Sequence, residues 1–153
     1  MYKRQALALS LLGDVLLMLP SDRFVAGLAA FLLAHLAYVG GFVDGGLSAP
    51  RALLTAAVVA AVVGPVGIRI VRGAARTQRD AAIPVAVYIT VISAMIVSAG
   101  GSGRVVALAG AALFAFSDSL IGWNRFVAAT RHASVTIMVT YHLGQALLVL
   151  FLL

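Results

Sequence analysis

Apolar residues follow one another in long runs along this chain, and short polar segments separate the runs. Six runs are apparent, at 5–19, 24–43, 52–71, 81–99, 104–122 and 133–153. A helix needs roughly 20 residues to cross a hydrocarbon core of about 30 Å, and five of the runs have that length within two residues. Strands with alternating polar faces are missing. The pattern predicts an all-α fold, a polytopic transmembrane bundle of about six helices in a single domain, residues 1–153.

Residues that stop or cap helices stand at the joints between these runs. Pro20 ends the first run, and Ser21-Asp22 is a capping pair for the next helix. Lys3-Arg4 before an apolar run imitates a signal peptide, but Asp14 interrupts the run and no small-residue cleavage site follows. We therefore expect the first run to be a helix of the bundle.

The composition excludes a soluble protein. Hydrophobic residues make up 63% of the chain and charged residues 10%, whereas a soluble domain has about 25% charged residues to cover its surface. A soluble enzyme and a nucleic-acid-binding protein are both excluded. The net charge of +6 is typical of the positive-inside bias and of contact with anionic lipid. Cysteine and glutamate are absent, so acid–base chemistry rests on aspartate and histidine.

The basic residues divide unequally between the two ends of the bundle. Four belong to one end and seven to the other, namely Lys3, Arg4, Arg51 and Arg104 against Arg23, Arg69, Arg72, Arg76, Arg79, Arg125 and Arg131. The positive-inside rule predicts that the end with seven faces the cytoplasm and that both termini lie outside. The four arginines at 69–79 recur every three or four residues, as expected for side chains that snorkel to lipid phosphates from a helix end and the following loop. A specific ligand site is the alternative.

A short motif recurs about 103 residues further along the chain. Arg23-Phe24-Val25-Ala26 is repeated as Arg125-Phe126-Val127-Ala128, with an aspartate upstream and a tyrosine–histidine pair downstream of each copy. An even number of helices separates the copies, so both point the same way. We expect a parallel internal repeat that sets Asp14 and Asp118 at similar depth.

Asp14 and Asp118 are the main candidates for chemistry. An ionised aspartate near the middle of a spanning helix costs about 2.5–3.5 kcal/mol on insertion scales, so such residues face the bundle interior and are functional suspects. Five further polar residues lie within apolar runs: His35, Tyr38, Tyr88, Tyr141 and His142. Hydrogen bonds between helices explain all of these residues without any ligand, and this structural alternative stays open.

Several motifs together resemble the YhhN-like family of membrane lysoplasmalogenases. They are Leu12-Gly13-Asp14-Val15-Leu16-Leu17-Met18, Phe31-Leu32-Leu33-Ala34-His35-Leu36-Ala37-Tyr38, Val87-Tyr88-Ile89, Phe116-Ser117-Asp118-Ser119 and Tyr141-His142-Leu143-Gly144-Gln145. The resemblance covers nearly the whole chain in the family's order. It implies a hydrolase that cleaves the vinyl ether of lysoplasmalogens to a fatty aldehyde and a glycerophospho-base. Members usually have about eight spans, so we expect this chain to begin near the family's third helix.

The chemistry of that reaction suits two aspartates. A vinyl ether hydrolyses after protonation on carbon, which needs a carboxylic acid, while an ionised carboxylate stabilises the resulting cation. Asp14 and Asp118 are the expected catalytic pair, and the sequence leaves open which one is the acid. The expected substrate-binding residues are His35, Tyr38, Tyr88, Ser117, Tyr141 and His142, with Arg23 and Arg125 for the phosphate. We expect no metal and no cofactor, and lysophospholipid and membrane lipid as partners.

Two other function classes remain open. A small transporter or a lipid-binding scaffold would use the aspartates for proton coupling or for structure. Helix breaks at matching positions would favour a transporter, but only Gly64-Pro65 and Pro84 hint at breaks, and both lie outside the repeated motifs. A metal-dependent lipid hydrolase would place His35, His142 and an aspartate around zinc, although their spacing has no metal signature. The arginine-rich, Ala/Val-rich composition favours a bacterial inner-membrane location.

Overall fold

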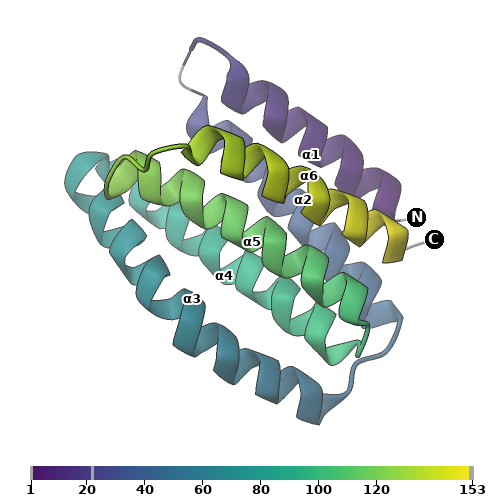
Figure 1. Cartoon of the computed structure of the whole chain (residues 1–153). Coiled ribbons are helices and arrows are strands. Elements are labelled where there is room, and N and C mark those ends of the chain that lie inside the picture. The colour runs from purple at the N-terminus through teal and green to yellow at the C-terminus, as the bar shows by residue number, and fades with distance from the viewer. Residues whose placement is uncertain (1, 22, 152–153) are drawn as a thin grey trace.

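The computed structural model describes residues 2–21 and 23–151 and contains six α-helices in that part of the chain (Figure 1). Their bounds are α1 Tyr2–Met18, α2 Phe24–Asp44, α3 Ala49–Thr77, α4 Arg79–Gly101, α5 Val105–Phe126 and α6 Ala133–Phe151. Each helix covers one of the six predicted apolar runs. The all-α prediction is therefore confirmed. The proposed internal repeat stays a prediction.

Neighbouring helices in the sequence form three antiparallel hairpins. The most extensive packing joins α1 to α2, α3 to α4 and α5 to α6, and the contact of α2 with α4 joins the first two hairpins. The hairpin of α5 and α6 joins the others mainly through α4. In Figure 1, α1 and α3 occupy opposite edges of the bundle, and the two chain ends lie together at one end of it.

Five of these helices, α2 to α6, are long and apolar enough to cross a membrane. Their outer surfaces are apolar as well, because Leu53, Val62 and Val105 are 72%, 64% and 78% exposed. A surface of this kind has to be covered by lipid or by protein. The chain is an integral membrane protein. The shorter α1 has 17 residues and packs along α2.

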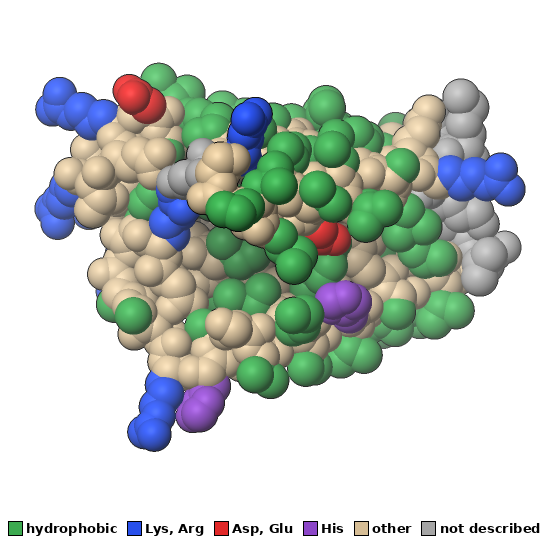
Figure 2. Space-filling view, turned by 90° about the horizontal axis from the view of Figure 1, so that it is seen from above, with side chains coloured by type: hydrophobic (Ala, Val, Ile, Leu, Met, Phe, Trp, Pro, Cys, Tyr) green, Lys and Arg blue, Asp and Glu red, His purple; other side chains and the backbone are tan. Residues whose placement is uncertain are grey.

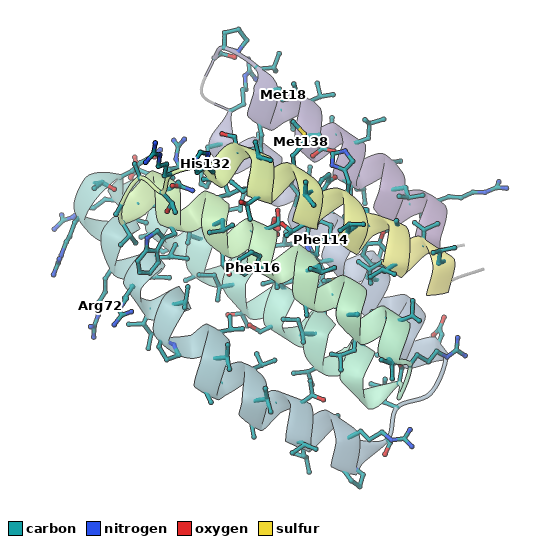
Figure 3. All side chains as sticks on the ribbon, in the orientation of Figure 1. Met18, Arg72, Phe114, Phe116, His132 and Met138 are labelled. Atoms are coloured by element: carbon teal, nitrogen blue, oxygen red, sulfur yellow. The ribbon has the colours of Figure 1, made fainter. Side chains whose placement is uncertain are left out.

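One predicted helix boundary is wrong. It lies at the arginine-rich end, the end of the bundle that carries seven of the basic residues. The predicted third helix ends at residue 71, but α3 continues to Thr77, so Arg72 and Arg76 are helical and Arg79 begins α4. Arginine and alanine are good helix formers, and a helix can continue past the apolar core while its arginines reach the lipid headgroups. Figure 2 shows most of the visible basic side chains gathered at one end of the molecule, and Figure 3 shows Arg72 pointing outward there.

Three smaller expectations also change. Pro65 and Pro84 lie inside α3 and α4, and neither breaks its helix, as is common in membrane helices whose neighbours satisfy the freed backbone groups. Arg125, expected in a loop, lies in the last turn of α5. Two aspartates that stand between the predicted apolar runs are helical. Asp44 is the last residue of α2, and Asp80 lies in the first turn of α4. The predicted cap at Asp22 falls outside the described residues.

A close backbone approach fixes α5 against α6. A Cβ atom added at Gly144 would lie 3.0 Å from the Gly110 carbonyl oxygen and 3.0 Å from the Phe114 nitrogen. Small residues let membrane helices approach in this way. Phe114, which is fully buried and labelled in Figure 3, fills the space beside this contact. The two helices that carry Asp118 and Tyr141 are therefore held in a fixed register.

Candidate active site

Asp118 lies in the middle of the bundle, on α5. Its side chain is 11% exposed. The Tyr88 hydroxyl, from α4, donates a hydrogen bond to Oδ2 of Asp118. The His35 Nε2 atom, from α2, lies 3.9 Å from the same oxygen, which is too long for a direct hydrogen bond. Three helices thus bring a carboxyl, a phenol and an imidazole together.

The imidazole of His35 has a defined orientation. Its Nδ1 lies 2.5 Å from the Phe31 carbonyl oxygen, which can only accept, so Nδ1 carries the hydrogen. Edge-on contacts with Phe114 and Tyr88, at centroid distances of 4.7 and 5.4 Å, hold the ring. Nε2 is buried and has no hydrogen-bond partner among the described residues. In the neutral ring it is a free acceptor that faces Asp118.

Asp14 lies at a more open place, on α1, where it is partly exposed. The Tyr141 hydroxyl, from α6, donates to its Oδ2 at 2.7 Å. Gln145 Nε2 donates to the Tyr141 hydroxyl at 3.4 Å, and the Tyr38 hydroxyl donates to Gln145 Oε1 at 2.8 Å. A chain of hydrogen bonds therefore connects α2, α6 and α1, and its far end, Tyr38, is buried.

A cluster of aromatic rings lies between the two aspartates. Phe31, Phe114 and Tyr141 contact one another edge to face, with centroids 5.1 to 6.1 Å apart. Asp14 is four residues from the end of α1 and Asp118 eight from the end of α5, which is about 6 Å and 12 Å of helix, so their similar depth stays a prediction.

Asp118 also lines a small internal cavity of about 50 Å³. Apart from Asp118, Tyr88 and Ser119, its walls are apolar side chains and glycines of α1 to α5. A cavity of this volume can hold a water molecule where polar groups line it. Asp14 is not among the residues that line this cavity, so a cavity common to both aspartates stays a prediction.

The remaining predicted residues lie around these two groups. Ser117 is fully buried and donates to the Ile137 carbonyl oxygen at 3.3 Å, which ties α5 to α6. His142 is exposed, its Nδ1 bonds the Met138 carbonyl oxygen at 2.7 Å, and its ring contacts that of Tyr141. Of the predicted polar residues on α6, His142 therefore lies outside the packed interior.

The two predicted phosphate-binding arginines lie at the arginine-rich end. Arg125 stacks over the Phe24 ring, with its guanidinium carbon 4.2 Å from the centroid, and donates to Gln78 Oε1 at 3.1 Å. Arg23 is exposed and directly precedes α2. Both charges are therefore on the surface, toward the membrane interface nearer to the aspartates.

Sequence comparison places this chain in a known family. The model of the YhhN family matches residues 4–152. The chain belongs to the YhhN family. Similar proteins include the lysoplasmalogenase of Mycobacterium bovis, 37% identical over 148 residues, and lysoplasmalogenase TMEM86B of Homo sapiens, 36% identical over 148 residues. These alignments cover 94% and 95% of this chain but 57% and 60% of the relatives. No solved structure matches.

The structure adds one residue to those expected for this YhhN chain. Gln145 joins Tyr38 to Tyr141 and is 9% exposed. The sequence feature that could have indicated Gln145 is a polar amide within an apolar run. Gln145 follows Tyr141 by four residues, which places both on the same helix face. Within residues 2–21 and 23–151, no group of three or more histidine and aspartate side chains is arranged to hold a metal ion.

Proposed function

We propose that this chain is a lysoplasmalogenase-like hydrolase, which cleaves the vinyl ether bond of lysoplasmalogens to a fatty aldehyde and a glycerophospho-base. The observation that carries the proposal is Asp118, which faces an apolar cavity beside the free acceptor Nε2 of His35. The similar proteins from Mycobacterium bovis and Homo sapiens, both lysoplasmalogenases, support it. The proposal includes a bacterial inner-membrane location with the arginine-rich end toward the cytoplasm.

The reaction begins with proton transfer to carbon. The carboxylic acid gives its proton to the vinyl carbon that is not bonded to oxygen, and the double-bond electrons form the new C–H bond. An oxocarbenium ion results. Water adds to its carbon, the proton that water loses returns to the carboxylate, and the hemiacetal separates into aldehyde and alcohol. The acid is regenerated, so the step needs neither an oxidant nor a metal.

We assign the acid role to Asp118. A bare carboxylate in an apolar cavity is costly, so these surroundings suit a neutral acid that waits for its substrate. After proton transfer, the Tyr88 hydroxyl stabilises the new carboxylate by hydrogen bonding. Water held between Asp118 and His35 Nε2 would satisfy the imidazole acceptor and lie next to the reacting carbon. His35 then positions the water.

Asp14 takes the second role. It is partly exposed and accepts a hydrogen bond from Tyr141, and this hydrogen bond favours its ionised form. We assign to its negative charge the stabilisation of the oxocarbenium ion. Tyr38 and Gln145 position Tyr141 in this scheme. Arg23, Arg125 and the exposed His142 would bind the glycerophospho-base by charge-assisted hydrogen bonds.

The test is an incubation of the purified chain with lysoplasmenylethanolamine in detergent, followed by detection of free aldehyde. A saturated alkyl ether and an ester lysolipid of equal chain length are the comparison substrates. Acid catalysis on carbon requires the vinyl double bond, so only the vinyl ether should be cleaved. Equal cleavage of the ester would overturn the proposal and indicate an esterase with an acyl nucleophile.

A further inference from the structure

A second hollow lies on the outer side of the bundle, between α3 and α5. This groove has a volume of about 630 Å³, and its walls come mainly from residues 58–66 of α3 and 112–123 of α5. Three wall residues, Val58, Val62 and Phe116, are 54%, 64% and 50% exposed. The groove is therefore open to the surroundings of α3 and α5, which in a membrane are the lipid chains.

The groove and the Asp118 cavity share part of their walls. Val63, Ala115 and Ser119 line both. Ser119 follows Asp118 directly, and Ala115 lies one turn before it on α5. A molecule lying in the groove would therefore pass within one side chain of the carboxyl group. Apart from Ser119 and Thr130, and the indole nitrogen of Trp123, the groove walls are hydrocarbon and aromatic side chains.

The dimensions of the groove match one leaflet of a bilayer. From Ala112 to Trp123 the groove follows α5 for 11 residues, which is about 16 Å at 1.5 Å per residue. Half of a hydrocarbon core of about 30 Å has the same length. Trp123 and Thr130 lie at the arginine-rich end, where a tryptophan suits the headgroup level. A lipid chain with its headgroup at that end would extend toward Ala112.

The depth of Asp118 agrees with this orientation. Asp118 is five residues before Trp123, about 8 Å deeper along the helix. In a lysoplasmalogen the vinyl ether is the first group of the chain below the glycerol, so it lies just inside the interface. A substrate whose headgroup is level with Trp123 would bring its reactive bond near Asp118, while the saturated remainder of the chain continues along the groove.

We propose that the groove between α3 and α5 binds the hydrocarbon chain of the lysolipid substrate, which enters sideways from the leaflet at the arginine-rich end. This inference rests on the proposed function for the identity of the lipid. The position of the chain is argued from the geometry of the groove. Ala112 marks its deep end, so the groove also sets a preference for chain length.

Photo-crosslinking tests the position of the chain without any need for turnover. The probe is a saturated alkyl-ether lysophosphoethanolamine that carries a diazirine in the outer half of its chain, added to the protein in lipid nanodiscs. Labelled residues should come from 58–66 of α3 and 112–116 of α5. Labelling spread evenly over exposed positions of α6, such as Val139 and Leu143, would overturn the proposal. Absence of label in the groove would also overturn the proposal. This result is expected if a second copy of the chain or another helix covers the groove.

Chain-length selectivity tests the deep end of the groove. Ala112→Phe narrows it, and Ala146→Phe, at an exposed position on α6 that lines neither hollow, is the matched control. With a hexadecenyl substrate, Ala112→Phe should raise KM about tenfold, the loss expected for the contacts of about two methylenes, and the KM for an octenyl substrate should rise far less. The control should match the wild type for both.

The outcomes separate the two proposals. Equal KM changes for both chain lengths, or equal behaviour of Ala112→Phe and Ala146→Phe, would overturn the groove assignment while leaving hydrolysis intact. A wild-type protein that cleaves neither substrate would overturn the proposed function, and the crosslinking map would still decide whether a lipid chain lies in the groove.

Discussion

Asp118 and Asp14 are the same residue type, each within a helix of the bundle, but their surroundings differ. Asp118 is nearly enclosed, next to a buried imidazole acceptor and an apolar cavity. Asp14 is partly exposed and ends a chain of hydrogen bonds that starts at Tyr38. Each carboxyl accepts from one tyrosine, Tyr88 or Tyr141. In the proposed mechanism the neighbours of each carboxyl group, and not its residue type, decide which aspartate is the acid and which is ionised.

The substitution with the largest expected effect is Asp118→Asn, which tests the proposed acid role of Asp118. The amide keeps the shape of the side chain but has no acidic proton to give to carbon. We expect the rate of aldehyde release to fall by about 10²- to 10⁴-fold, the range for loss of general acid catalysis. The protein should still fold, because a neutral amide is easier to bury than a charge. A steady-state assay and the thermal unfolding midpoint of the variant together check both statements.

Two exposed aspartates serve as controls for that change. Asp44 ends α2 and Asp80 lies in the first turn of α4, and neither lines the cavity or the groove. Asp44→Asn and Asp80→Asn should keep near-normal rates. Full activity in Asp118→Asn would return Asp118 to a structural role.

Asp14→Asn should have the next largest effect, about 10²-fold, because the cation loses a nearby negative charge. The Asp14→Asn, Asp118→Asn double variant should be little slower than Asp118→Asn alone, since residues that act as one unit are strongly non-additive. The rates of the wild type, the two single variants and the double variant form a double-mutant cycle. Additive losses would show that the two carboxyl groups act independently.

Removal of a tyrosine hydroxyl group tests the same difference between Asp118 and Asp14, with a smaller expected effect. Tyr88→Phe removes the donor to the buried Asp118, and Tyr141→Phe removes the donor to the partly exposed Asp14. We expect a rate loss of about tenfold for Tyr88→Phe and about threefold for Tyr141→Phe, because hydrogen bonds between membrane helices contribute about 0.6 kcal/mol on average and up to about 1.7. A larger loss in Tyr141→Phe would reverse the assignment of the two roles.

The smallest expected effect belongs to Gln145→Leu. This change removes the link between Tyr38 and Tyr141 but touches nothing at Asp118. The rate should fall about twofold and the free energy of unfolding by roughly 1 kcal/mol. Combined with Tyr141→Phe, the change should add nothing further to the rate loss, because both act through Asp14. A further loss on combination would contradict the positioning role of Gln145.

Much of the fold followed from hydropathy, and the exceptions have a common cause. Apolar runs locate the part of each helix that lies in the hydrocarbon core, whereas hydrogen bonding and helix propensity decide where a helix ends. This is why α3 continues through Arg72 and Arg76 to Thr77 beyond its apolar run. Both α3 and α4 continue through a proline, Pro65 and Pro84, because packing against neighbours compensates for the lost backbone bonds.

The chemical groups of the candidate site could be predicted from the sequence, but their pairing could not. An aspartate, a histidine or a tyrosine within an apolar run is noticeable because burying it is costly. Which tyrosine meets which aspartate depends on helix rotation and on the order of helices in the bundle. The tyrosine bound to Asp118 is Tyr88 of α4, which belongs to neither copy of the repeated motif.

The hydrogen bond between Tyr141 and Asp14 has a consequence for how the protein is made. Its two residues are 127 positions apart and belong to the first and the last hairpin. At a synthesis rate of about 5–20 residues per second, the ribosome needs about 6 to 25 s to reach Tyr141 after Asp14. During that interval Asp14 enters the membrane without its partner. The last hairpin thus completes the hydrogen bonds of Asp14, and a nascent chain stalled before α6 would lack them and be a ready target for quality control.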